Sequence, residues 1–222
     1  LALSALLTVQ STGTPVLLTS EPLALWLTLP VLVVYPMLFA WLSHRTAIRL
    51  AEHKRRLELM STRDGMTGVF NRRHWETLLR NEFEACRRSH RQATILLIDI
   101  DHFKTINDTW GHDVGDEAIV AITRQLQLTL RAGDYIGRFG GDEFAVIMSG
   151  TPADNAIAAM ARVHERLVNM PLHGAPMARL CISVGVAPWG AQFTHYREWL
   201  KAADVALYKA KNAGRGRTEV AA

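Results

Sequence analysis

The feature that most constrains the fold is an apolar run that ends in carboxylates, "ATILLIDID" at residues 93–101. No polar residue interrupts it between Ile95 and Ile98, so we expect a strand buried on both faces rather than a half-exposed one. Asp99 and Asp101 lie two residues apart and should point to one side of that strand, with Ile100 opposite. Such a strand requires a sheet covered by helices on both sides.

The rest of the chain from residue 64 onward alternates between strand and helix patterns. We predict an α/β fold, an α+β sandwich, because helical patterns alternate with β-rich runs. The runs within 135–150 should form a hairpin, since Gly140 and Gly141 can adopt the positive φ that a tight turn needs. Helices are expected over 72–90, within 111–134, and over 153–170 and 196–214, and a further strand over 180–189.

The hairpin tip carries two acids, Asp142 and Glu143, that a turn does not need. If the strand ending in Asp99 lies beside it, the carboxylates would form a site for a hard divalent cation. Gly140 and Gly141 would let backbone amides approach phosphate oxygens, where a side chain would clash. This combination predicts Mg²⁺-dependent phosphoryl or nucleotidyl transfer on a triphosphate.

Other polar residues are candidates to hold a nucleotide. A polyphosphate tail could be bound by Lys104, Lys211 and Arg215, and a guanine edge could be read by Asn107 and Asp116. For each residue alone, a solvated surface role is the more frequent alternative.

An apolar stretch near the N-terminus, "LALWLTLPVLVVYPMLFAWL" at 23–42, carries no charge. It would reach about 30 Å as a helix and so predicts a membrane span. A buried core helix and a signal peptide are the alternatives. Basic residues follow the stretch, which places that end in the cytoplasm and attracts membrane lipid. The expected location is the inner (cytoplasmic) membrane, with the catalytic domain in the cytoplasm.

We expect three regions along the chain. Residues 1–42 would be the C-terminal part of a membrane-associated sensor, and 43–63 a linker helix that signals or dimerises, with a solvated spacer helix as the alternative. The domain that carries the acids would cover 64–222.

Several motifs together resemble the GGDEF family of diguanylate cyclases. They are "DGMTGVFNRR", "DIDHFKTINDTWGHDVGDEAI", "RAGDYIGRFGGDEF", "ISVGVA" and "ALYKAKNAGRGR", and they span roughly residues 60–218. The N-terminal stub is similar to that of membrane-anchored AdrA-type cyclases, which control cellulose and biofilm formation. Met66 and Val69 depart from the leucines usual in the entry motif, which should alter packing alone.

The resemblance implies a palm-like nucleotidyl-cyclase fold with a mostly antiparallel sheet flanked by helices. It implies condensation of two GTP into cyclic di-GMP and two pyrophosphates with Mg²⁺, for which Mn²⁺ can substitute. The metal ligands would be Asp99, the Ile100 carbonyl, Asp142 and Glu143, and Glu143 would also be catalytic. Asn107 and Asp116 would bind guanine, and the phosphates would be contacted by Phe103, Lys104, Gly140, Gly141, Lys211 and Arg215.

The family also has an inhibitory product site, which here would be Arg131, Asp134 and Arg162, with Arg166 in reserve. The alternative is that Arg131 lies in the last turn of a helix, where a cation is favoured by the dipole. One domain holds one GTP, so the reaction requires a homodimer.

Two further functions compete with this hypothesis. One is another palm-type nucleotidyl transferase such as an adenylyl cyclase, against which Asn107 and Asp116 argue. The other is a membrane-tethered cyclic di-GMP receptor without turnover, which would not need Asp99, Asp142 and Glu143 together. No nucleic-acid partner is expected, because the basic residues are not interleaved with aromatic ones.

Overall fold

The computed structural model describes residues 32–50, 62–168, 170–175 and 177–221. The chain divides into two compact units, Leu1–Met60 and Ser61–Ala222. Each unit is described by itself.

In the first unit, residues 32–50 form a helix. Its apolar part covers 32–42 and then meets His44, Arg45 and Arg49, and the Arg45 guanidinium lies over the Trp41 ring at 4.7 Å. In the part of the chain that the structure describes, no helix combines the length and the apolarity that crossing a bilayer requires.

This finding overturns the expected localisation in the inner membrane. Of the predicted span over 23–42, residues 23–31 lie outside the described residues. Of the predicted linker helix, 43–50 is helical and 51–61 also lies outside them.

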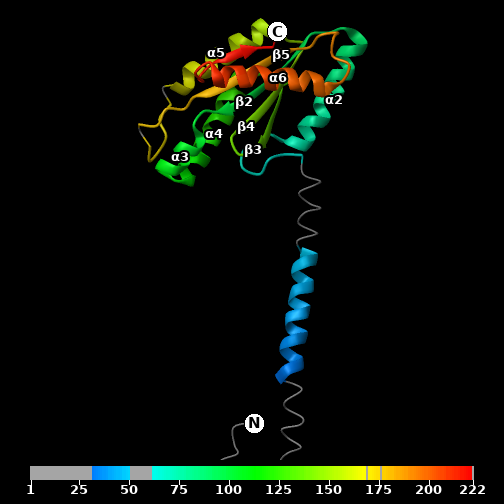
Figure 1. The fold of residues 1–222 in the computed structure, drawn as a ribbon, viewed down its shortest axis with the longest axis vertical. Helices are drawn as coiled ribbons and strands as arrows, with labels where there is room; N and C mark the ends of the chain where they lie inside the picture. The colour runs from blue at the N-terminus through cyan, green and yellow to red at the C-terminus, as the bar shows by residue number, and fades with distance from the viewer. Residues whose placement is uncertain (1–31, 51–61, 169, 176, 222) are drawn as a thin grey trace, which may run out of the picture. The chain divides into compact units, whose positions relative to one another are not determined.

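The second unit is built on one six-stranded sheet in the order β1-β3-β4-β2-β5-β6. Its strands are β1 (Phe70–Asn71), β2 (Ala93–Ile100), β3 (Tyr135–Gly140), β4 (Glu143–Ser149), β5 (Ile182–Pro188) and β6 (Thr218–Val220). Its helices are α2 (Arg72–Ser89), α3 (Phe103–Trp110), α4 (His112–Thr129), α5 (Ala153–Val168) and α6 (Tyr196–Asn212) (Figure 1).

The strand pairing explains why β2 is the most apolar strand. It lies between β4 and β5, antiparallel to both, and all eight of its residues are buried. β3 and β4 are also antiparallel. The short edge strands pair in parallel with their neighbours, β1 with β3 and β6 with β5. The sheet is therefore mixed, with antiparallel pairing at its centre, and the expected α/β sandwich is confirmed.

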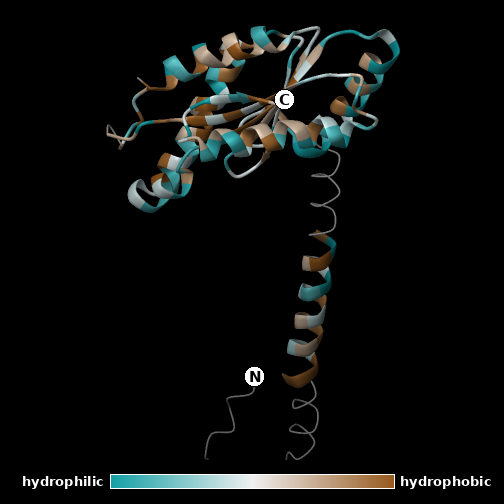
Figure 2. Ribbon diagram, turned by 45° about the horizontal axis from the view of Figure 1, so that its top comes forward, coloured by the Kyte–Doolittle hydropathy of each residue, from teal (hydrophilic) through white to brown (hydrophobic). Residues whose placement is uncertain are grey.

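Helices cover both faces of this sheet. On one face Leu96 and Ile98 of β2 pack in a core with residues of α3, α4 and α5. On the other face Ile95 and Leu97 pack with Trp75 of α2 and Trp199 of α6. Figure 2 shows the apolar colour concentrated on the strands between these helices. Alternation along β2 places Asp99 on the α2/α6 face, with Leu97.

Candidate active site

The acids predicted from the sequence meet where β2 and β4 run side by side. Asp99 lies directly opposite Glu143 in the register of these strands. The Ile100 N–H donates to the carbonyl of Asp142 at 3.2 Å. The structure thus brings together the end of β2 and the β3–β4 turn, although their residues lie more than 40 positions apart.

The turn itself differs from the predicted one by one residue. Gly140 still pairs with Glu143, so the turn consists of Gly141 and Asp142, after a register shift between Arg138 and Gly140. Gly140 has φ 143° and Gly141 has φ 48°, both in the region that favours glycine. Both glycines are needed for the conformation, but Asp142 rather than Gly140 occupies the turn.

Asp99 is already paired with a cation from the chain. The Lys211 Nζ lies 2.7 Å from its Oδ2, and the side chain of Asp99 is 11% exposed. Burial raises the pKa of Asp99 above its ordinary value; Lys211 opposes that rise, and the charges of Asp142 and Glu143 add to it. The chain therefore gathers more negative charge at this point than a single lysine can neutralise.

This donor set fits a magnesium ion shared with a nucleotide. No three acidic, histidine or cysteine side chains converge tightly enough to hold a metal ion among the described residues. Mg²⁺ usually takes one or two carboxylates from the protein and its remaining oxygens from water and substrate phosphates. Asp99, Glu143 and backbone carbonyls can supply such a partial shell, and a triphosphate would complete it.

A second buried carboxylate, Asp101, organises the loop after α6. Its Oδ1 accepts from the Ser183 hydroxyl at 2.7 Å and its Oδ2 from the Gly216 N–H at 2.8 Å. The neighbouring Arg215, a predicted phosphate ligand, has φ 62° and is exposed. The alternation in "DID" predicted that Asp101 lies on the same side as Asp99. Its hydrogen-bond donor Gly216 lies 115 residues away, and no local signal identifies that contact.

A third predicted group lies between α3 and α4. The Asn107 side chain from α3 packs against Gly115 of α4, and its Oδ1 is buried with no hydrogen-bond partner among the described residues. Phe103 is partly buried beside it, whereas Lys104 and Asp116 are exposed. An unsatisfied buried acceptor next to an exposed carboxylate suits a ligand with two adjacent donors.

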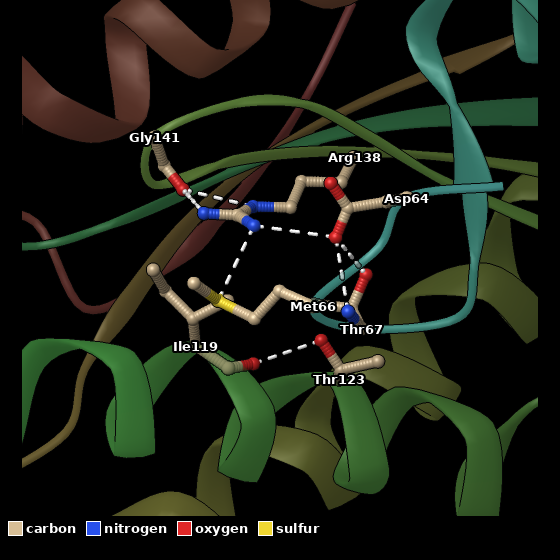
Figure 3. A network of polar contacts seen from close by, with 7 residues as sticks. All are labelled: Asp64, Met66, Thr67, Ile119, Thr123, Arg138 and Gly141. Carbon is tan, nitrogen blue, oxygen red and sulfur yellow. Dashed lines mark hydrogen bonds and ion pairs between the residues drawn. The ribbon is translucent and has the colours of Figure 1, made fainter. Parts of the chain in front are cut away.

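A polar network connects the β3–β4 turn to the segment that enters the domain (Figure 3). Arg138 donates through Nε and Nη2 to the Gly141 carbonyl at 3.1 and 2.8 Å, and through Nη1 to Asp64 Oδ1 at 3.2 Å. Asp64 also accepts from the N–H and the hydroxyl of Thr67, and these bonds lower its pKa although burial opposes them. No sequence pattern predicts the Arg138–Asp64 pair, which fixes the glycine turn to residues 64–67.

The residues predicted for an inhibitory site are only partly brought together. Arg131 and Asp134 line a hollow of about 400 Å³ together with Arg63. Arg131 lies beyond the end of α4 rather than in its last turn, because Leu130 is the C-cap. Its N–H donates to Asp134 Oδ2 at 2.9 Å.

Neither candidate arginine of α5 is among the residues that line this hollow. Arg162 is exposed on α5, and Arg166 on the same helix donates to the Thr129 hydroxyl at 3.2 Å. Arg166 therefore contacts the end of α4, close in sequence to Arg131.

Comparisons with known proteins agree with this arrangement. The family model described as "Diguanylate cyclase, GGDEF domain" matches residues 61–217. The chain is 69% identical, over all 222 residues, to a probable diguanylate cyclase, DgcC, of Escherichia coli K12, and spans 60% of that relative's length. It is 36% identical over 175 residues to the diguanylate cyclase DgcM of the same organism, covering 76% of this chain and 41% of that one.

A solved structure has the same fold. The coiled coil and GGDEF domain of DgcB from Caulobacter crescentus, in complex with c-di-GMP, matches with a TM-score of 0.70 and 27% sequence identity. The match covers 83% of this chain and 99% of that one.

Proposed function

Because this chain belongs to the GGDEF family of diguanylate cyclases, we propose that it condenses two GTP into cyclic di-GMP and two pyrophosphates. The observation that carries the proposal is the placement of Asp99 opposite Glu143 beneath a glycine turn. The chain spans 60% of its DgcC relative, so the activity of a whole protein is part of the proposal.

We propose that Asp99, the Ile100 carbonyl, Asp142 and Glu143 hold Mg²⁺, or Mn²⁺ in its place. The ion would supply charge neutralisation for the triphosphate. Lys211 and Arg215 would bind the phosphates together with Lys104 and the amides of Gly140 and Gly141. Phe103 would line the same tract from the start of α3.

The chain's own residues would accept the proton of the 3′-hydroxyl and orient the two GTP molecules. The 3′-oxygen of one GTP bonds to the α-phosphorus of the other, and the bond from that phosphorus to the bridging oxygen breaks as pyrophosphate leaves. Glu143 accepts the proton of the 3′-hydroxyl. A second identical step closes the ring.

We propose guanine as the base because of the acceptors between α3 and α4. Guanine presents N1–H and N2–H₂ side by side, which suit Asn107 Oδ1 and the Asp116 carboxylate. Adenine presents an acceptor at N1 and would leave one of them unpaired. This favours a diguanylate cyclase over an adenylyl cyclase.

Each domain would hold one GTP, so the two phosphodiester bonds require two copies face to face. Product would bind at the hollow of Arg131 and Asp134, with Arg162 as a further ligand, and inhibit turnover. A role in cellulose and biofilm formation rests on the resemblance to AdrA-type cyclases alone.

The test is to incubate the purified chain with GTP and Mg²⁺ at a concentration where it is dimeric, and to separate the products by liquid chromatography. We expect cyclic di-GMP from the wild type, none from Glu143→Gln, and wild-type turnover from Glu84→Gln, which alters an exposed glutamate paired with Arg87 on α2. If the wild type gives no product but binds cyclic di-GMP, the chain is a receptor and not a cyclase.

A further inference from the structure

We propose that Gly115 is a positioning residue for nucleotide selection, because it leaves the space in which the Asn107 amide sits. The inference rests on the proposed function and adds a residue that makes no contact with the base. Gly115 is buried in the first turns of α4, next to Asp116 in sequence.

Gly115 has no backbone reason to be a glycine. It lies within a regular helix and is not among the glycines with positive φ. In a helix interior glycine costs roughly 0.5–1 kcal/mol relative to alanine. A glycine at this position therefore needs an explanation from its surroundings.

The surroundings supply that explanation. A Cβ at residue 115 would overlap Asn107 Oδ1, and would lie 2.9 Å from Asn107 Cγ and 3.3 Å from Phe103 Cζ. Both neighbours come from α3, and both are assigned to the substrate in the proposed function. The groups that would collide are side-chain ends, so an added methyl group would displace the amide and not the helix.

The displaced atom would be Asn107 Oδ1, which has no hydrogen-bond partner within the described chain. Asn107 Oδ1 is buried and accepts no hydrogen bond from the residues that the structure describes. A buried acceptor without a partner is unfavourable, and a donor from the ligand would satisfy it. Gly115 thus holds an unsatisfied acceptor in the place where the base would supply the donor.

The two roles of a helical glycine predict opposite changes. If Gly115 matters only for helix packing, Gly115→Ala should lower stability and leave the relative affinities for purines unchanged. If it positions Asn107, the variant should fold with an unchanged or raised melting temperature, because alanine favours helix, and should lose affinity for guanine nucleotides.

We would measure equilibrium binding of α,β-methylene-GTP and α,β-methylene-ATP to the full chain, since neither analogue can release pyrophosphate. Gly115→Ala should weaken binding of the guanine analogue about 10- to 100-fold, as expected for a buried acceptor moved out of reach. Binding of the adenine analogue should change less than about twofold. The matched control is Gly65→Ala, where a Cβ would meet no atom within 4 Å.

A double-variant cycle gives a second test of the same inference. In the Gly115→Ala background, Asn107→Ala should cost no further affinity, because the amide is already displaced. Additive losses, or equal losses for both analogues, would overturn the inference. These measurements do not require turnover, so a wild type that binds the guanine analogue but makes no cyclic di-GMP would refute the proposed function and leave this inference intact.

Discussion

The candidate site has two ends, one at the β3–β4 turn and one between α3 and α4. They differ in the hydrogen-bond and ion-pair partners that the chain itself supplies to their polar groups. At the turn, Asp99 is paired with Lys211 and the turn carbonyl of Gly141 accepts two bonds from Arg138. Between the helices, Asn107 Oδ1 is buried without a partner in the described chain and Asp116 is exposed.

The difference indicates two modes of preparation for substrate. At the turn, like charges would repel if nothing opposed them, and the chain supplies its own cation, which the metal of the proposed function would displace. Between the helices, a neutral amide can be left unpaired at a cost of about 1–3 kcal/mol, which a ligand donor then recovers. The first end should govern rate and the second should govern choice of base.

The largest expected effect comes from removing the charge at the turn. Asp99→Asn should lower turnover of GTP by roughly 10²–10³-fold or more, the size found when one preorganised electrostatic group is lost. Affinity for GMP without divalent ions should stay within twofold of wild type. Turnover and calorimetric binding would be compared. The control is Asp204→Asn, which alters an exposed aspartate of α6.

Equal losses of turnover and of metal-free GMP affinity would break the comparison, because the two ends would then act as one. The comparison would also fail if Asp99→Asn kept wild-type turnover.

The sequence was sufficient to predict the acids of the turn but not their neighbours. Asp99 and Glu143 could be proposed as partners because one ends a buried strand and the other begins a strand after two glycines. That β2 lies between β4 and β5, and so beside the β3–β4 turn, follows from the packing of the whole sheet. Lys211 was expected on phosphate, and in the structure its Nζ lies 2.7 Å from Asp99 Oδ2.

Long-range contacts account for what the sequence could not reveal. Asp101 holds Gly216, and Arg138 holds Asp64, across separations of 115 and 74 residues. The function of Gly115 depends on a side chain from another helix, so nothing in the local pattern distinguishes it from an ordinary helical glycine. The membrane localisation was predicted from the uncharged stretch 23–42, whereas no helix among the described residues is long and apolar enough to cross a bilayer.

A second, smaller effect is expected from removing the cation that the chain supplies. Lys211→Met should raise the KM for GTP about tenfold, because a charged contact to phosphate is worth roughly 1.5–3 kcal/mol at most. Without nucleotide, the same variant should bind Mn²⁺ roughly 3- to 10-fold more tightly, since the metal no longer competes with an ammonium group on Asp99.

Metal affinity would be followed by the electron paramagnetic resonance of free Mn²⁺. Lys201→Met is the matched control, because Lys201 lies on the same helix and pairs with the exposed Asp204. Weaker or unchanged Mn²⁺ binding by Lys211→Met would show that Lys211 does not occupy the position of the ion.

The smallest effect concerns His164 on α5, which contacts the first residue of β6. Its Nε2 lies 3.2 Å from the Thr218 hydroxyl, and burial lowers its pKa, partly opposed by the charge of Asp101. The unfolded chain takes up this proton near pH 6.5, and the folded chain does so at a lower pH. His164 therefore stabilises the fold fully above about pH 6.5, and this contribution is lost as the pH falls through that value toward the lower folded pKa.

His164→Gln should remove that dependence. Between pH 7 and pH 5 the melting temperature of the variant should fall by roughly 1–3 °C less than that of the wild type. Scanning calorimetry at both pH values would measure it, with the exposed His173→Gln as a control. A wild-type slope that survives His164→Gln would assign the proton to another group. A slope that also changes in Asp101→Asn would show that the charge of Asp101 acts on His164, whereas the α3–α4 end should respond to neither change.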